Sequence, residues 1–461
     1  MAGIGFELQK LVKKGTYFSY LKAFLYGAVL SSGPWLTTTA ALILIGIYTG
    51  AYAAAGPARL LTVTVIYAYA FSLILTGPWQ NTLIRFIADR VFLKKPEQIV
   101  PGYRTASLPV LALGLLVGVP AVVLMRFDVS PGNALLFRLA ALLLLLVLSE
   151  LWMLMSYVST TRNYRQVFVS FFVGSAASFA LSVVLMKRAD ASWALLGYLT
   201  GQVAILVLLF LIGEREFDGK GWWEPSYFRW LKPYRHIAFA GLFYNAGVWA
   251  DKIVVWFTIG RPEGASIFHT CNVYDVPAFL AFLSMVPGLA YFLIIAETTF
   301  YQSYRRFVDS ILRDPLVLID SARVDLLETA QKGLLGLSKF QGVFTLALFI
   351  LAPQVLKVTG YGWVSVNLFR ILLMGAFANV LFLNVVILML YLELRQEAAA
   401  TTLAFFVLNT IFTLFSVRWG AAHLGWSYLA AASIALLWAT RLFVDRFEEI
   451  DYHLYVRQVA V

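Results

Sequence analysis

The sequence predicts an all-α, polytopic membrane protein with about 12 transmembrane helices, arranged as two six-helix lobes around a central cavity, with both termini in the cytoplasm. Three observations support this fold. The chain has 461 residues, of which 61% are hydrophobic and only 13% are charged, a balance that soluble domains do not show. Long apolar runs follow one another along the chain. Lys and Arg collect in every second gap between these runs, which is the positive-inside pattern.

Each apolar run can cross a bilayer as one helix, because about 20 residues span a hydrocarbon core of about 30 Å. The runs lack the polar–apolar alternation that marks a membrane-spanning barrel strand. The basic gaps place both termini, and the gap after every second crossing, on the cytoplasmic side. In chain order, the predicted crossings are 22–48, 60–84, 105–125, 134–158, 166–186, 191–212, 236–259, 270–299, 340–357, 363–392, 399–417 and 425–443.

A charged, Trp-rich segment at 213–235 separates the first six crossings from the last six. It predicts an N-lobe at 1–212, which begins with an interfacial segment, then a cytoplasmic linker at 213–235, and a C-lobe at 236–461. A second polar segment, 302–339, is expected to form interfacial helices on the cytoplasmic side of the C-lobe. Six plus six crossings favour two parallel repeats about an axis normal to the membrane.

Composition also limits the possible functions. Cys271 is the only cysteine and the four histidines are scattered, so we expect no disulfide within the chain, no metal site and no cofactor. The net charge of +11 lies beside the ends of the crossings, where it meets anionic lipid headgroups, and nucleic acid is not an expected partner. No stretch outside the predicted crossings exceeds about 40 residues, which is shorter than a catalytic domain. The sequence therefore predicts a transporter and not an enzyme.

Glycine–proline pairs interrupt three of the crossings. Proline removes a backbone donor and clashes with the preceding turn, so each helix is expected to bend at these positions. The bends could serve static packing, or they could act as gates when two lobes rock against each other, and both readings stay open. In chain order, the pairs are Gly33-Pro34, Gly77-Pro78 and Pro287-Gly288.

Polar side chains deep in the crossings are candidates for a substrate path, because a charge at a helix centre costs about 2.5–3.5 kcal/mol on insertion scales. Glu150 lies in the fourth crossing, and the first six crossings hold no basic residue at its depth. It therefore faces water, is protonated, or is a neutral group hydrogen-bonded within the bundle. The further candidates are Asp275, Glu297, Asn245 and Asn379.

Three charged residues form a second set within the C-lobe. Asp251 and Lys252 lie in the seventh crossing and Arg370 lies in the tenth. At about 1.5 Å per residue, Asp251 lies about 12 Å and Arg370 about 10 Å from the outer ends of their helices. We therefore expect Arg370 to offset Asp251, or all three residues to form one network. This network either holds the C-lobe together or contacts the substrate.

Several segments also carry distinctive local sequences. They are Met1-Ala2-Gly3-Ile4-Gly5-Phe6-Glu7-Leu8, Ser31-Ser32-Gly33-Pro34-Trp35, the block from Trp249 to Lys252, and the run from Tyr274 to Phe292 with Glu297-Thr298. Together these segments resemble the PelG family of bacterial exopolysaccharide exporters.

The resemblance implies a twelve-helix transporter of the multidrug/oligosaccharidyl-lipid/polysaccharide (MOP) superfamily in the bacterial inner membrane. It implies export of Pel, a partly deacetylated and hence cationic amino-sugar polymer. It also implies three partners in a synthase complex. These are a cytosolic glycosyltransferase that builds the polymer, a membrane protein that is a cyclic-di-GMP receptor, and a small membrane protein.

A cationic polymer needs a hydrated path of negative potential, which carboxylates rather than arginines should line. Glu150 is the first expected lining residue, followed by Asp275 and Glu297, and the segments 213–235 and 302–339 are the expected docking sites for the glycosyltransferase. Other functions stay open for this fold, namely a lipid-linked oligosaccharide flippase, a cation-coupled small-molecule antiporter and a non-transporting scaffold of a synthase. The first crossing holds no acidic residue of the kind that a proton-coupled antiporter needs.

Overall fold

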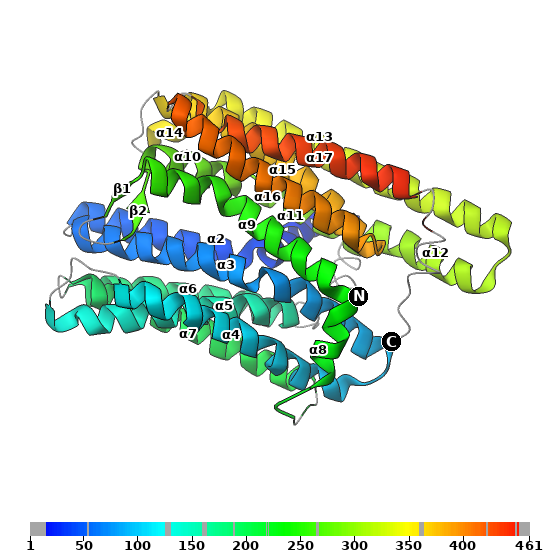
Figure 1. The fold of residues 1–461 in the computed structure, drawn as a ribbon, viewed down its shortest axis with the longest axis horizontal. Coiled ribbons are helices and arrows are strands. Elements are labelled where there is room, and N and C mark those ends of the chain that lie inside the picture. Colours follow the sequence, from blue (N-terminus) through cyan, green and yellow to red (C-terminus); the bar gives the residue numbers. More distant parts are fainter. Residues whose placement is uncertain are drawn as a thin grey trace.

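In the computed structural model, the described part of the chain is a bundle of long helices with one pair of two-residue strands (Figure 1). We call the end of the bundle that carries these strands the strand end, and the opposite end, which carries α8, the linker end. The structure describes residues 15–52, 55–124, 131–158, 164–187, 190–217, 219, 221–263, 267–358, 364–420, 423–447 and 450.

The helices fall into two sets, which we call the N-lobe (α2 to α7) and the C-lobe (α9 to α17). The N-lobe elements are α2 (Tyr17–Tyr52), α3 (Ala55–Phe92), η1 (Pro96–Gln98), α4 (Ile99–Leu124), η2 (Pro131–Asn133), α5 (Ala134–Val158), α6 (Tyr164–Met186) and α7 (Ala191–Glu216). The linker contains α8 (Ser226–Leu231) and η3 (Lys232–Tyr234). The C-lobe elements are α9 (Arg235–Thr258), β1 (Arg261–Pro262), β2 (His269–Thr270), α10 (Asn272–Leu283), α11 (Val286–Ile295), η4 (Ala296–Phe300), α12 (Tyr301–Arg313), α13 (Leu316–Ile350), α14 (Ala352–Val358), α15 (Val364–Tyr391), α16 (Arg395–Trp419) and α17 (Trp426–Phe447).

The long apolar runs of the sequence coincide with helices. Ten helices among the described residues are long and apolar enough to cross a membrane. The other two predicted crossings fall on α2, whose described apolar stretch is Leu36–Tyr48, and on α9, which carries Asp251 and Lys252.

One predicted boundary needs correction. The segment 302–339 was expected to form interfacial helices ahead of a crossing at 340–357, but α13 runs without a break from Leu316 to Ile350. The segment forms nearly all of α12 and the first part of α13. These two helices pack against each other and project beyond the other helices at the linker end (Figure 1). Apolar side chains, among them Phe307 and Leu326, are buried in this hairpin, and exposed ion pairs lie along its surface. These pairs are Arg306–Asp325 at 3.1 Å and Lys332–Glu328 at 2.8 Å.

The eighth crossing is interrupted at Pro287-Gly288. Helix α10 ends at Leu283, and α11 begins at Val286 with the proline in its first turn. The interruption leaves the carbonyl of Ser284 available, and Gln341 of α13 donates to it at 2.8 Å. A side chain from a neighbouring helix therefore satisfies a backbone group that lipid could not.

Helix pairing follows a similar order in both lobes. In the N-lobe, α3 packs on α5, α5 on α7, and α6 on α7; in the C-lobe, α10 packs on α15, α15 on α17, and α16 on α17. Between the lobes, α3 packs on α9 and α2 packs on α11. Two repeats would produce this correspondence, which supports the predicted duplication.

The α3–α9 contact, which we call the seam, joins the two lobes. The helices run antiparallel, and at mid-length a Cβ atom on Gly241 would lie 2.1 Å from the carbonyl oxygen of Gly77. One turn away, Asn245 Nδ2 donates to the carbonyl of Leu73 at 2.9 Å. The missing glycine side chains let the two backbones come this close, as small residues commonly do in membranes.

Replacing Gly241 by Ala should weaken the seam. The added methyl group would clash with the Gly77 carbonyl, and overpacking of this kind costs about 1–3 kcal/mol. We expect a lower unfolding temperature in detergent, measured by a thermal shift assay.

The matched control is Gly342→Ala on α13. Its new Cβ atom would lie 3.7 Å from the Phe377 ring, an ordinary contact, so the unfolding temperature should stay the same or rise with the better helix propensity of alanine. Equal behaviour of the two variants would contradict the close approach at the seam.

Candidate functional site

Helix α9 presents polar residues on two faces. One face carries Gly241 and Asn245, which contact α3 of the N-lobe. Another face carries Asp251, which is buried within the C-lobe. Lys252 lies seven residues from Asn245, on the same side of the helix, and its ammonium group reaches round to Asp251. The helix therefore belongs both to the seam and to the interior of the C-lobe.

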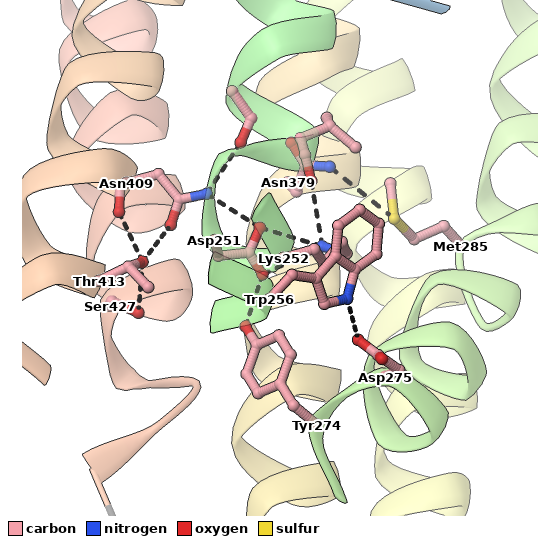
Figure 2. A network of polar contacts seen from close by, with 12 residues as sticks. Asp251, Lys252, Trp256, Tyr274, Asp275, Met285, Asn379, Asn409, Thr413 and Ser427 are labelled. Carbon is pink, nitrogen blue, oxygen red and sulfur yellow. Dashed lines mark hydrogen bonds and ion pairs between the residues drawn. The ribbon is translucent and has the colours of Figure 1, made fainter. Parts of the chain in front are cut away.

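Asp251 is fully buried, and its carboxylate accepts hydrogen bonds from three side chains (Figure 2). The donors are Lys252 Nζ at 3.0 Å, Tyr274 Oη at 2.5 Å and Asn409 Nδ2 at 3.3 Å. We call these four residues the Asp251 network. It ties α9 to α10 and α16, and the one carboxylate and one ammonium group balance in charge.

The remaining contacts of Lys252 and Asn409 complete this region. Lys252 Nζ also donates to the carbonyl of Val248 at 3.0 Å and lies 4.1 Å from the centre of the Phe282 ring. Cation–π contact of this kind stabilises a desolvated ammonium group. Asn409 also donates to the carbonyl of Gly247 at 2.8 Å. The ammonium group of Lys252 and both carboxylate oxygens of Asp251 therefore find their hydrogen-bond partners inside the protein.

Arg370 does not join the Asp251 network. The Nε of Arg370 donates to the backbone carbonyl of Phe349 on α13 at 3.1 Å. The guanidinium carbon of Arg370 lies 4.9 Å from the centre of the Phe349 ring. Depth along a helix was the basis of the expectation, but depth does not tell which way a side chain faces. The charge that offsets Asp251 comes from Lys252, whose flexible four-carbon side chain bends back to this adjacent residue.

Asn379 lies near the interruption of the eighth crossing. Its Nδ2 donates to Tyr244 Oη at 3.4 Å. The same nitrogen faces the sulfur of Met285 at 3.9 Å (Figure 2). Both Asn379 and Asn245 therefore contact other protein helices, the first within the C-lobe and the second across the seam.

The predicted carboxylates lie apart from one another. Asp275 accepts from Trp256 Nε1 at 2.8 Å and from the amide of Cys271 at 2.9 Å, so it joins α9 to the start of α10. Glu150 faces α4, where Tyr103 Oη donates to its Oε2 at 3.2 Å. Glu297 lies in the π-helical turn η4, and its side chain falls outside the described residues.

The predicted bends differ from one helix to the next. Helix α3 continues through Gly77-Pro78, and α2 continues through Gly33 and Pro34, although the side chain of Pro34 is outside the described residues. Of the three pairs, only Pro287-Gly288 lies beside a break, in the first turn of α11 just after the break at Ser284 and Met285. Gating at these positions stays a prediction.

Sequence reasoning missed two members of the Asp251 network, Tyr274 and Asn409. Asn409 lies 158 positions from Asp251 along the chain, and no local spacing links them. The sequence did hold a signal for Asn409. A carboxylate buried in a membrane needs hydrogen-bond donors, and an asparagine within an apolar helix can supply one.

Comparisons with known proteins support a transporter. The sequence matches the family described as "PelG: Putative exopolysaccharide Exporter (EPS-E)" over residues 1–455. No curated protein matches it.

Solved structures of low sequence identity share the fold. One is a MATE protein in complex with MaD5, with a TM-score of 0.58 and 12% identity, covering 94% of this chain and 97% of that one. Another is a MOP superfamily transporter from Pyrococcus furiosus, with a TM-score of 0.53 and 14% identity, covering 93% and 96%. An outward-facing multidrug resistance MATE transporter gives the same values. The predicted two-lobed, all-α polytopic fold is confirmed, whereas the side of the membrane on which the termini lie stays a prediction.

Replacing Asp251 by Asn should destabilise the C-lobe. The change leaves the buried ammonium group of Lys252 without its counter-charge, and breaking a buried pair in this way costs about 3–5 kcal/mol. We expect less folded protein and a lower unfolding temperature in detergent. The double variant Asp251→Asn with Lys252→Met, which removes both charges, should recover most of the loss.

The control is Asp445→Asn, because Asp445 pairs with Arg441 at the surface, where both side chains are more than half exposed. That change should leave the unfolding temperature nearly unaltered. A stable Asp251→Asn variant that no longer exports polymer would instead make Asp251 a substrate contact.

Proposed function

This chain belongs to the PelG family, and we propose that it exports a cationic amino-sugar exopolysaccharide, Pel, across the bacterial inner membrane along a route between its two lobes. The observation that carries the proposal is the family match, which extends over residues 1–455 and so includes all helices of both lobes. The family consists of transporters and not of enzymes.

The way the lobes meet supports a route between them. The N-lobe and the C-lobe touch mainly through two helix pairs, α3 on α9 and α2 on α11. The α2–α11 contact also uses small residues, since a Cβ atom on Gly27 would lie 3.2 Å from the carbonyl oxygen of Ala290. The Asp251 network lies within one lobe and keeps that lobe intact when these contacts separate.

Glu150 is the carboxylate that we propose to meet the cationic polymer. Asp251 and Asp275 are engaged by donors within the C-lobe. Glu150 accepts from Tyr103 Oη at 3.2 Å and also interacts with the hydroxyl of Ser107, and both partners lie on α4. Glu150 and its partner Tyr103 on α4 both belong to the N-lobe. The proposal therefore requires α4 to shift against α5 within that lobe, so that the carboxylate faces the polymer.

We further propose that the linker end receives the synthase partners, namely the cytosolic glycosyltransferase, the cyclic-di-GMP receptor and the small membrane protein. The linker and the α12–α13 hairpin both lie at this end (Figure 1). The tip of the hairpin exposes Leu312, Leu316 and Val317, each by more than two thirds of its surface. An apolar tip on a projecting, charge-paired hairpin suits contact with another protein.

Vesicles with the cytoplasmic face outward test export directly. With the chain and its synthase partners present, added sugar nucleotide should yield polymer inside the vesicle, protected from an external glycoside hydrolase. Polymer that forms at the usual rate but stays digestible outside would contradict export. Vesicles without the chain provide the baseline.

The Glu150→Gln variant tests the acidic path in the same assay. We expect the protected polymer to fall by about tenfold, the change that corresponds to losing about 1.4 kcal/mol of interaction. Synthesis measured as sugar nucleotide consumed in the first minutes should stay normal, which separates transport from a scaffold role. The matched control is Glu263→Gln, which removes a carboxylate paired with Arg59 at the strand end, away from the proposed docking site. Full export by the Glu150→Gln variant would rule out the carboxylate role.

A further inference from the structure

The linker end of the seam holds a cluster of charged side chains from both lobes. Arg85 of α3 lies 2.6 Å from the carboxylate of Glu393, in the turn between α15 and α16, and 3.1 Å from Asp89 on its own helix. Arg395 binds the same Glu393 carboxylate at 2.5 Å. Glu393 therefore joins one guanidinium group of the N-lobe to one of the C-lobe.

The linker packs over this cluster and connects to both sides of it. Asp89 accepts from Trp230 Nε1 at 3.0 Å and from Tyr234 Oη at 3.3 Å. The ring of Tyr234 lies 4.1 Å from the guanidinium carbon of Arg395 and 5.6 Å from that of Arg85. The segment that joins the lobes in sequence therefore also lines their contact in space.

Glu393 closes the end of α15. Its φ angle is +62°, the left-handed conformation that commonly closes a helix. The amide of Leu394 donates to the carbonyl of Met389 at 2.8 Å, and the amide of Glu393 donates to the carbonyl of Leu390 at 3.3 Å. This backbone turn fixes the position of Glu393, whose carboxylate lies between the two arginines, one of which belongs to the other lobe.

A different kind of contact closes the strand end of the same seam. Tyr67 of α3 exchanges two hydrogen bonds with the backbone of His269, at 2.9 and 3.0 Å, and its ring stacks on Trp256 at 4.6 Å. Tyr67 and Arg85 are 18 residues apart, or about 27 Å along the helix. This distance is close to the thickness of a hydrocarbon core, about 30 Å. The Gly77–Gly241 contact lies between them.

We propose that the Arg85–Glu393 cluster is a latch that holds the two lobes together at the linker end, and that its release lets the lobes pivot about the Gly77–Gly241 contact. The inference goes beyond the proposed export function, because it concerns the conformational equilibrium of the chain whatever substrate it carries.

The two ends of the seam should respond differently to salt. The side chains of Arg85 and Glu393 are 36% and 12% exposed, so ions reach the pair from one side. The strand end depends on ring stacking and backbone hydrogen bonds, which salt screens little. Among the residues that the structure describes there, Arg59 and Glu263 form an ion pair whose arginine is 57% exposed, and such a pair contributes little energy.

Spin-label distances measured by pulsed electron resonance test the latch in purified full-length protein. The background variant replaces the single cysteine, Cys271, by Ser. One label pair, at Phe92 and Val444, reports on the linker end, and a second pair, at Leu124 and Trp419, reports on the strand end. All four sites are exposed at helix ends, on α3, α17, α4 and α16.

Glu393→Gln should add a longer distance population to the linker-end pair while the strand-end pair keeps or shortens its distance. Arg85→Gln should produce the same shift from the other lobe, and the double variant should add nothing further, as expected for two partners of one interaction. Salt of about 1 M, where the Debye length is about 3 Å, should shift the unmodified chain the same way. Tyr67→Ala should instead lengthen the strand-end distance.

The control is Glu214→Gln, which breaks the Arg104–Glu214 pair within the N-lobe, at 2.8 Å, and should leave both distances unchanged. The proposal fails if Glu393→Gln and Arg85→Gln leave the linker-end distance unaltered, or if both label pairs lengthen together. Should Glu393→Gln not fold, Arg85→Gln decides alone. Because no polymer is present, failure of the latch and failure of the export function are separate results.

Discussion

The contact between Gly77 and Gly241 sets the geometry on which the other inter-lobe contacts of α3 and α9 depend. In a bilayer no hydrophobic force favours one helix face over lipid, so association rests on close packing and on hydrogen bonds between helices. The seam has both, in the glycine contact and in the bond from Asn245 to the carbonyl of Leu73. This crossing fixes the register that brings Tyr67 opposite Trp256.

The two faces of α9 have different mechanical roles. On one face, Asp251 is bonded to α10 and α16 through Tyr274 and Asn409, and separating these bonds would expose a charge to lipid at high cost. On the other face, the contact at Gly241 involves few side-chain atoms. Helix α9 therefore stays with the C-lobe when the lobes separate, and the contact that opens is the one between α3 and α9.

The helices could be predicted from the sequence, but most contacts between them could not. Hydropathy depends on each segment alone, so the apolar runs identified the crossings. They did not show the break between α10 and α11, or that α13 begins well before its apolar stretch. Side-chain partners depend on which way each helix faces. Arg370 had the predicted depth and another partner, Phe349. Glu393 was missed because its partner Arg85 lies 308 positions earlier in the chain.

The basic residues raise a question about the polymer itself. The positive-inside pattern predicts that the linker end faces the cytoplasm, and its exposed cations would repel a cationic chain within a Debye length of about 8–10 Å. A polymer handed over directly by a docked glycosyltransferase would avoid that barrier, and so would a polymer whose amines are still acetylated. A neutral chain would give Glu150 no charge to meet. Whether export requires the Glu150 carboxylate therefore indicates whether the polymer is charged or neutral while it crosses the membrane.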